Sequence, residues 1–315
     1  MTEVVKKIKK RIPFNPQVDA ILSSGPLAMD FNYGLSEFLQ YTADLDLIMK
    51  GVPFKELGIS ERRNKNSRGI VLNFESSSSR AVIQASEDNI DWLSDYPPGS
   101  VAVIRLSGGM YAQGGLSHQG IDQFSDKLKL IDSNPNIIAC IVEITSGGGQ
   151  VTAANMAHSA IKSFSKPIIA SVVMAASAAY HAACACDEIY AVTDQSEIGS
   201  IGVMMTLPKD LAKNYKKWYT ELYSDDSPDK NGTWRDYIQT GDTDVFKKDL
   251  TESDEYFMAI VSENRNLKGT EAQRKKTLSG GMFYAKEAKR RGLIDGVQDM
   301  NYIMKRITTL IKNRA

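Results

Sequence analysis

The sequence has few histidines, and its charge shows no excess of either sign. Only His118, His158 and His181 occur in 315 residues, so a histidine-rich zinc site and a Ser-His-Asp triad both have few candidate residues. The 38 basic and 38 acidic side chains cancel to a formal net charge of zero. A general nucleic-acid-binding protein normally carries a basic excess, so we expect no nucleic-acid partner.

Cysteine is also scarce. Cys140, Cys184 and Cys186 lie in apolar stretches, and an odd number without regular spacing does not make a disulfide framework. The Cys184-x-Cys186 pair lacks the second pair that a four-ligand metal site needs. We therefore expect small buried side chains in a reducing compartment, and we expect neither a metal nor a cofactor.

One uncharged run, residues 168–186, approaches the length of a membrane span, which is about 20 residues. Its β-branched beginning, Ile168–Val173, predicts a buried strand, and its alanine-rich remainder predicts a buried helix. At the N-terminus, basic residues between Lys6 and Arg11 are followed by proline and polar residues instead of the apolar core of a secretion signal. We expect a cytoplasmic protein without a stable membrane anchor.

The composition changes near Tyr96-Pro97-Pro98-Gly99, which we interpret as a domain boundary. Residues 1–97 mix prolines, a polar cluster and a run of serines, with an amphipathic helix expected over 35–49 and a short strand over 70–74. No residue pattern there indicates chemistry. We interpret this part as an N-terminal extension with a docking or assembly role.

Residues 98–315 alternate between predicted strands and predicted helices. Strands are expected at 101–106, 137–144, 168–173, 188–192 and 219–223, and helices at 121–131, at about 152–164, from 177, over the lysine-rich stretch 209–217, through much of the chain after 245, and at 301–312. This alternation predicts an α/β fold with a mostly parallel sheet flanked by helices.

A glycine-rich corner, Thr145-Ser146-Gly147-Gly148-Gly149, stands between a predicted buried strand and a predicted helix. Adjacent glycines let backbone N–H groups approach a ligand, and the start of the helix adds positive potential. Such a corner suits a phosphate or an oxyanion, but the Gly-Lys-Ser/Thr of a P-loop does not follow. A tight turn without a ligand is the alternative interpretation.

Ser177 lies at a predicted strand-to-helix transition and is flanked by small residues on both sides. A nucleophile needs this arrangement, because the substrate backbone must approach the hydroxyl while a neighbouring N–H faces the developing negative charge. A helix N-cap serine is the alternative.

A serine nucleophile also needs a base. His181 follows Ser177 by one helical turn, and His118 and His158 have no evident orienting carboxylate. A deprotonated lysine is the other option, although its usual pKa near 10.4 must fall before it acts at neutral pH. The downstream candidates are Lys209, Lys213, Lys216, Lys217 and Lys230. The first four share one predicted amphipathic helix, which favours a solvated face.

Three segments in the same order resemble the signal peptide peptidase A family of Ser-Lys proteases, which includes bacteriophage head-maturation proteases. Ile144–Val151 resembles the family's D-S-P-G-G-S-V corner, and Ala175–Val203 resembles its block A-A-S-G-G-Y-Y to G-S-I-G-V. Tyr284–Asp295 resembles its late segment Y-x-G-x-x-A-x-x-x-G-L-V-D. The resemblance extends over about two thirds of the chain, from Val101 to Asp299.

The resemblance implies a ClpP/crotonase-type core with Ser177 as nucleophile and Lys230, 53 residues later, as general base. It implies an oxyanion hole at Gly148, with Gly149 beside it and the backbone N–H of Ala178 as second donor. A ClpP-type histidine would fall 25 residues after the serine, where this sequence has Gly202, so the resemblance favours a Ser-Lys dyad over a triad.

The sequence departs from the family pattern at three places. Gly147 replaces the proline of the corner and Thr145 replaces its acidic residue. Alanines replace the two glycines after the nucleophile. The segment before Lys230 lacks the usual glycine and carries three acidic residues, whose charge opposes deprotonation of a lysine. These acidic residues are Asp225, Asp226 and Asp229.

We therefore expect a serine endopeptidase that acts on polypeptides through an acyl-enzyme and assembles as a homo-oligomeric ring. By resemblance, we expect a phage or prophage head-maturation protease that cuts scaffold or capsid protein. The alternatives are a bacterial cytoplasmic peptidase that degrades signal peptides or proteins, and a catalytically inactive assembly protein on the same fold. A crotonase-type acyl-CoA enzyme would use the oxyanion corner but would need neither Ser177 nor Lys230.

Overall fold

The structure is a computed structural model that describes residues 27–29, 70–73, 81–83, 93, 95–114, 119–207 and 210–314. Its strands are β1 (Leu27–Met29), β2 (Ile70–Asn73), β3 (Ala81–Ile83), β4 (Ser100–Met110), β5 (Ile137–Gln150), β6 (Ile168–Ala176), β7 (Glu188–Ala191), β8 (Glu197–Gly199), β9 (Met282–Tyr284) and β10 (Gly296–Val297). Its helices are α5 (Ile121–Ser133), α6 (Val151–Lys162), α7 (Ala178–Ala183), α8 (Leu211–Trp218), α9 (Gly232–Thr240), the 3-10 helix η2 (Thr243–Phe246), α10 (Lys247–Asn264), α11 (Glu271–Thr277), α12 (Ala285–Arg291) and α13 (Met300–Arg314).

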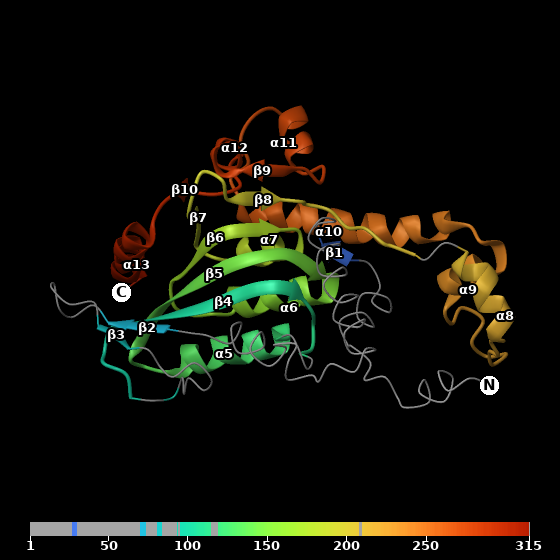
Figure 1. Cartoon of the computed structure of the whole chain (residues 1–315), viewed down its shortest axis with the longest axis horizontal. Coiled ribbons are helices and arrows are strands. Elements are labelled where there is room, and N and C mark those ends of the chain that lie inside the picture. Colours follow the sequence, from blue (N-terminus) through green and yellow to red (C-terminus); the bar gives the residue numbers. More distant parts are fainter. Residues whose placement is uncertain are drawn as a thin grey trace, which may run out of the picture.

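One sheet organises the fold, with the strand order β10-β7-β6-β5-β4-β2-β3 (Figure 1). The pairings of β4 with β5, β5 with β6, β6 with β7, and β7 with β10 are all parallel. The β-branched runs predicted as buried strands are the central strands β5 and β6, because a parallel sheet is covered on both faces. The prediction of an α/β fold with a mostly parallel sheet flanked by helices is confirmed.

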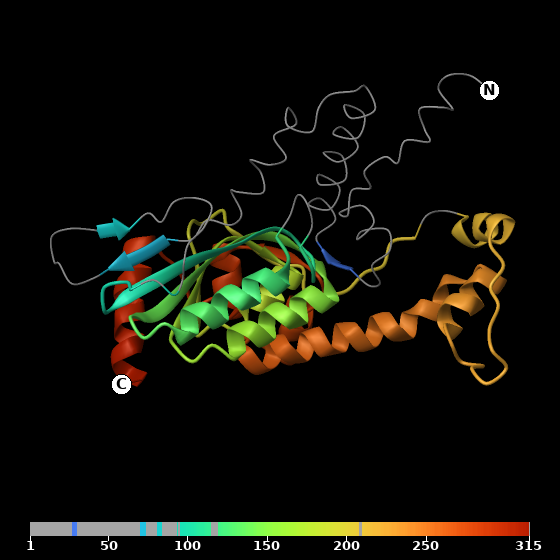
Figure 2. The same cartoon turned by 90° about the horizontal axis from the view of Figure 1, so that it is seen from below.

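The two faces of the sheet are covered differently. The largest hydrophobic cluster lies where α5, α6 and α7 pack on one face, and Figure 2 shows α5 and α6 side by side along it. On the other face, Ile303 and Ile307 of α13 pack against a smaller cluster from the central strands. Residues 168–186 are therefore β6 followed by the buried helix α7, as predicted, and no helix in the described part of the chain has the length and hydropathy to span a membrane.

Strands from the N-terminal extension belong to the same sheet as the core. β2, predicted over 70–74, pairs antiparallel with β4, and β1 pairs antiparallel with the end of β5. The described strands of the extension, β1, β2 and β3, thus belong to the core sheet. The helix expected over 35–49 lies outside the described residues, and the docking role of residues 1–97 stays a prediction.

A lobe of α8, α9 and η2 projects from this core on the N-terminal end of α10 (Figure 1). It has its own small hydrophobic cluster, which includes Tyr237, Ile238 and Phe246. The strand predicted over 219–223 is wrong: these residues pair with no strand. Instead, the Glu221 carboxylate accepts hydrogen bonds from the hydroxyls of Tyr215 and Tyr223, which hold the segment as a local loop.

Candidate active site

Ser177 occupies the sharp turn between β6 and α7, with φ 55° and ψ −122°. A residue other than glycine in the positive-φ region carries backbone strain of about 1–3 kcal/mol. Although Ser177 stands at the N-cap position, its side chain makes no capping hydrogen bond. The N-cap alternative therefore does not account for this serine, and the strand-turn-helix geometry is the kind that presents nucleophiles in α/β-hydrolases.

The segment Gly199–Gly202 holds this turn from one side. The Ser177 N–H donates to the Gly199 carbonyl at 2.8 Å, and the Ser177 Oγ lies 3.4 Å from the Gly202 carbonyl oxygen. Gly202, which holds the position of a ClpP-type histidine in the sequence, is thus also adjacent to Ser177 in space, and it carries no side chain. The Ser177 side chain and backbone together are 1% exposed.

The glycine-rich corner lies beside Ser177 because β5 and β6 run in parallel. Ser146 pairs with Ala175, so Gly148 and Ser177 each follow a paired residue by two positions. β5 continues through the corner to Gln150, and Gly148 adopts φ 101°, which favours glycine. The Gly148 N–H donates to the Ser146 hydroxyl at 3.1 Å, and this hydroxyl donates to the Gly108 carbonyl at 2.6 Å.

The other two predicted oxyanion residues have different surroundings. A Cβ atom on Gly149 would lie 2.0 Å from the Met110 carbonyl oxygen, so this glycine is required for close packing against β4. Ala178 is the first residue of α7, and its N–H has no partner within the helix because the first four N–H groups of any helix lack one. Ala178 and Ala179 are fully buried in the main hydrophobic cluster, so their methyl groups pack into the core.

The two histidines in the described residues are in an apolar cluster. The His181 ring packs against those of His158 and Phe257, at centroid distances of 5.1 and 4.9 Å. Burial, reinforced by the neighbouring His158, lowers the pKa of His181 to about 4. The His158 Nδ1 lies 3.1 Å from the His181 carbonyl oxygen. Neither ring is held by a carboxylate in the manner of a catalytic base, and His118 lies outside the described residues.

Lys230 lies in an exposed turn just before α9. The helix α9 belongs to the projecting lobe (Figure 1). The lobe is joined to the core through α10, whose Phe257 contacts the His181 ring and whose Lys247 end reaches the lobe, about 15 Å further along the helix axis. No hydrogen bond or ion pair among the described residues connects Lys230 with Ser177. The structure thus brings Ser177, Gly148 and Ala178 together, whereas Lys230 lies in the lobe, just before α9.

The remaining lysine candidates also lie in the lobe. Lys213, Lys216 and Lys217 are exposed on α8, in agreement with the prediction of a solvated face, and Lys216 Nζ donates to the Gln239 carbonyl at 2.8 Å. Lys209 lies outside the described residues. The acidic residues around Lys230 are exposed as well.

Asp254 is a residue near the site that the sequence did not reveal. It accepts a hydrogen bond from the Val203 backbone N–H, and a Cβ atom built on Gly202 would lie 3.4 Å from its Oδ1. Burial raises the pKa of Asp254 above its ordinary value. In the sequence it is one of several acidic residues on a helix, a pattern that also fits a solvated surface, so only the packing of α10 identifies it.

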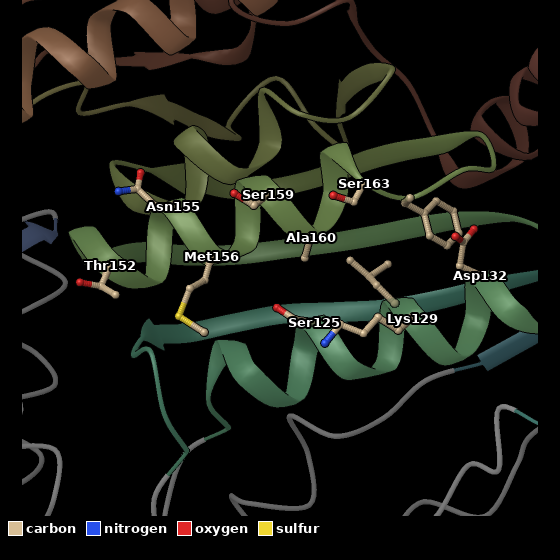
Figure 3. A pocket seen from close by; sticks show the side chains of 11 residues that line it. Ser125, Lys129, Asp132, Thr152, Asn155, Met156, Ser159, Ala160 and Ser163 are labelled. Atoms are coloured by element: carbon tan, nitrogen blue, oxygen red, sulfur yellow. The ribbon is translucent and has the colours of Figure 1, made fainter.

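The cysteines are buried, as predicted. Burial raises the pKa of the Cys184 thiol to about 12, so it is protonated and unreactive at neutral pH. A separate cavity of about 560 Å³ lies between α5 and α6, lined among others by Ser125, Asn155 and Met156 (Figure 3). None of the predicted site residues lines it.

Comparison with known proteins places this site in a family. The model of peptidase family S49 matches residues 160–314, a segment that includes Ser177 and Lys230. No curated protein sequence matches the chain.

Several solved structures are similar to this chain. A 1510-N membrane-bound stomatin-specific protease mutant is 18% identical, with a TM-score of 0.42 over 64% of this chain and 82% of that one. An enoyl-CoA hydratase from Shewanella pealeana is 15% identical, with a TM-score of 0.41 over 70% and 74%. A ClpP1 mutant from Listeria monocytogenes is 17% identical, with a TM-score of 0.39 over 62% and 91%.

The sheet described above has the mostly parallel strand order that was expected for the core. The match of residues 160–314 is also in accord with the motifs at Ala175–Val203 and Tyr284–Asp295, which lie within it. The resemblance to the signal peptide peptidase A family is therefore confirmed over residues 160–314, the segment that matches peptidase family S49.

Proposed function

We propose that this protein is a serine endopeptidase in which Ser177 attacks the peptide carbonyl and forms an acyl-enzyme. The observation that carries the proposal is the backbone of Ser177, strained at φ 55° in a turn where its side chain caps no helix. Strain of this kind persists where the surrounding structure enforces it, often at functional sites. The match to a peptidase family makes a peptide bond the expected substrate.

The oxyanion that forms in this reaction would be stabilised by two backbone donors. The Gly148 N–H, which donates to the Ser146 hydroxyl in this structure, would donate to the substrate oxygen instead. The Ala178 N–H at the start of α7 would be the second donor. Both belong to elements fixed by the parallel pairing of β5 and β6. Little rearrangement is then needed when negative charge develops.

We propose Lys230 as the general base, supplied to Ser177 by a neighbouring copy in a homo-oligomeric ring. The support is its position in the projecting lobe, which α10 holds away from the Ser177 turn of the same chain. The neutral amine would take the Ser177 proton as the Oγ–C bond forms and give it to the leaving nitrogen as the C–N bond breaks. It would then take a proton from the water that attacks the acyl-enzyme and give it to Ser177 Oγ as the acyl C–Oγ bond breaks.

The test uses the full chain with a fluorophosphonate probe and a set of casein-type peptides. Wild type is expected to gain one probe mass at Ser177 and to cleave peptides, whereas Ser177→Ala should do neither. Lys230→Ala should lose cleavage, and Lys213→Ala, an exposed lysine on α8, should keep it. Cleavage that persists in Ser177→Ala would overturn the assignment of Ser177 as nucleophile. Full activity in Lys230→Ala would overturn the assignment of Lys230 as base.

We further propose, on the family resemblance alone, that the natural substrates are scaffold or capsid proteins of a phage head. Co-expression of wild type or Ser177→Ala with the structural proteins encoded beside it tests this directly. Fragments that appear only with wild type would support the proposal. Degradation of signal peptides or unfolded proteins without cleavage of structural proteins would favour the bacterial peptidase instead.

A catalytically inactive assembly protein is the second candidate. The observation that favours it is that Lys230 directly precedes α9, a helix of the lobe that projects from the core (Figure 1). It predicts that wild type binds its partners without reacting with the probe. Probe labelling at Ser177 would exclude this candidate.

A further inference from the structure

The short strand β1 lies against the corner that holds Gly148. It pairs antiparallel with the last three residues of β5, in the register Leu27 with Gln150, Ala28 with Gly149 and Met29 with Gly148. In Figures 1 and 2, β1 is the dark-blue strand beside the end of β5. This chain therefore places a segment of its own backbone on the proposed oxyanion corner.

The register also shows which edge of β5 this segment occupies. On one edge, β4 pairs with the same residues, Gly109 with Gly148 and Met110 with Gly149. The other edge belongs to β6 up to the pair Ser146 with Ala175, after which β6 ends and turns into Ser177. β1 thus pairs with the edge of β5 that β6 no longer covers after Ser146. This is the edge next to the Ser177 turn.

An extended peptide reaches such a site by adding a strand to the free edge, since main-chain hydrogen bonds then align its carbonyl groups. To present a carbonyl to both Gly148 and Ser177, the peptide must pair with β5 at residues 148–150. β1 already occupies that position, and Ser177 is 1% exposed in this state. Without β1, the end of β5 would offer an unpaired edge next to the nucleophile.

We propose that β5 residues 148–150 form the peptide-binding edge of the site and that β1 is its resident blocking strand. The assignment of the edge to substrate rests on the function proposed for Ser177. β1 competes with any incoming peptide for the same main-chain hydrogen bonds. Because it is tethered in the same chain, its effective concentration is on the order of millimolar, and peptides bind only after it leaves.

The first experiment measures binding and needs no catalysis. A fluorescent peptide with the sequence of residues 22–34 is titrated into full-length Ser177→Ala protein, alone and combined with Ala28→Pro or Met29→Pro. Proline lacks the N–H and disrupts strand pairing, and only alternate residues of an antiparallel strand donate toward one neighbour, so both positions are substituted. Ala81→Pro, the same change in the N-terminal strand β3, is the matched control.

We expect at least one of the two β1 proline variants to bind the peptide about tenfold tighter or more than Ser177→Ala alone, with Ala81→Pro unchanged. Hydrogen exchange of residues 148–150 should accelerate in the same variant, which reports loss of β1 pairing even if overall stability falls. Equal binding in all variants, or unchanged exchange at 148–150, would overturn the blocking role.

The second experiment separates this inference from the proposed function. Ala28→Pro and Met29→Pro are made in the active chain, and fluorophosphonate labelling and peptide hydrolysis are followed. Faster labelling with a lower KM and unchanged kcat supports the blocking strand. Equal rates in all active chains overturn it while Ser177 stands as nucleophile. Tighter peptide binding without any labelling sustains the blocking strand and overturns the peptidase.

Discussion

At the level of single residues, two of the four non-glycine residues with positive φ in the described part of the chain lie at the proposed active site. Ser177 and Ser200 both have positive φ, and the Ser177 N–H is bound to the carbonyl of Gly199, which also has positive φ. Two strained residues, Ser177 and Ser200, on two adjoining segments indicate a geometry enforced by the surrounding sheet. Strain that does not improve packing lowers stability, so its removal has a measurable consequence.

Ser177→Gly is expected to be more stable than Ser177→Ala by about 1–2 kcal/mol, because glycine adopts positive φ without the Cβ penalty. Both variants lack the hydroxyl, so the difference isolates the backbone strain. Urea unfolding monitored by circular dichroism measures it. Equal midpoints for the two variants would show that the turn is unstrained.

Gly148→Ala is expected to reduce kcat by about 10²–10³-fold, because φ 101° disfavours alanine and the N–H donor would move. The control is Gly99→Ala, which places alanine at φ 86° with no atom near the new methyl group. It should share the loss of stability but keep the activity. Steady-state peptide hydrolysis distinguishes the two, and equal losses of kcat would remove Gly148 from the oxyanion hole.

Asp254 gives a prediction with a defined pH dependence. Burial raises its pKa in the folded protein, so the ionised form is disfavoured there and stability falls as pH rises above the ordinary value of 3.8. Asp254→Asn, which stays neutral, should therefore be more stable than wild type at pH 7 and nearly equal at pH 3. Urea midpoints at the two pH values test this, and a variant less stable at pH 7 would contradict it.

At the level of elements, α13 closes the face of the sheet opposite α7. Besides Ile303 and Ile307, Arg306 of this helix forms a two-pronged contact with Glu188 of β7, with N–O distances of 2.5–3.0 Å. The Glu188 side chain is 14% exposed, so its charge depends on this partner. The same carboxylate accepts from Tyr190, which joins helix and strand in one network.

Arg306→Met is expected to destabilise the protein by about 1–2 kcal/mol, less than a fully buried pair because the arginine is partly exposed. Arg306→Lys keeps the positive charge but cannot make the bidentate contact with Glu188. Its stability should lie between those of wild type and Arg306→Met. Urea unfolding of the three proteins gives the order. If Arg306→Met were as stable as wild type, the apolar contacts of α13 would suffice alone.

At the level of the whole molecule, the projecting lobe leads to a test of the proposed dyad between copies. An inactive Ser177→Ala chain mixed with an inactive Lys230→Ala chain is expected to regain activity if the dyad forms between copies. With random assembly at equal amounts, about a quarter of the sites would contain both residues. Refolding or subunit exchange of the mixture followed by peptide hydrolysis measures it, and no recovery despite subunit exchange would place both residues in one chain.

The local pattern of the sequence determined most of the core. Alternation of β-branched runs with helical periodicity predicted β4 to β7 and α5 to α7, because burial on both faces of a parallel sheet demands continuous apolar strands. The serine flanked by small residues predicted the strand-to-helix turn at Ser177. The strand predicted over 219–223 failed because apolar alternation alone does not supply a partner strand.

Only the tertiary structure decided how distant segments meet. Asp254 beside Gly202 and β1 on the glycine-rich corner are both contacts between residues far apart in sequence. Single-sequence patterns record the local environment of each residue, namely its burial and its secondary structure, and carry no register between elements. The sequence therefore determined which residues were candidates for the site, and the packing of the sheet and of α10 decided which of them lie together.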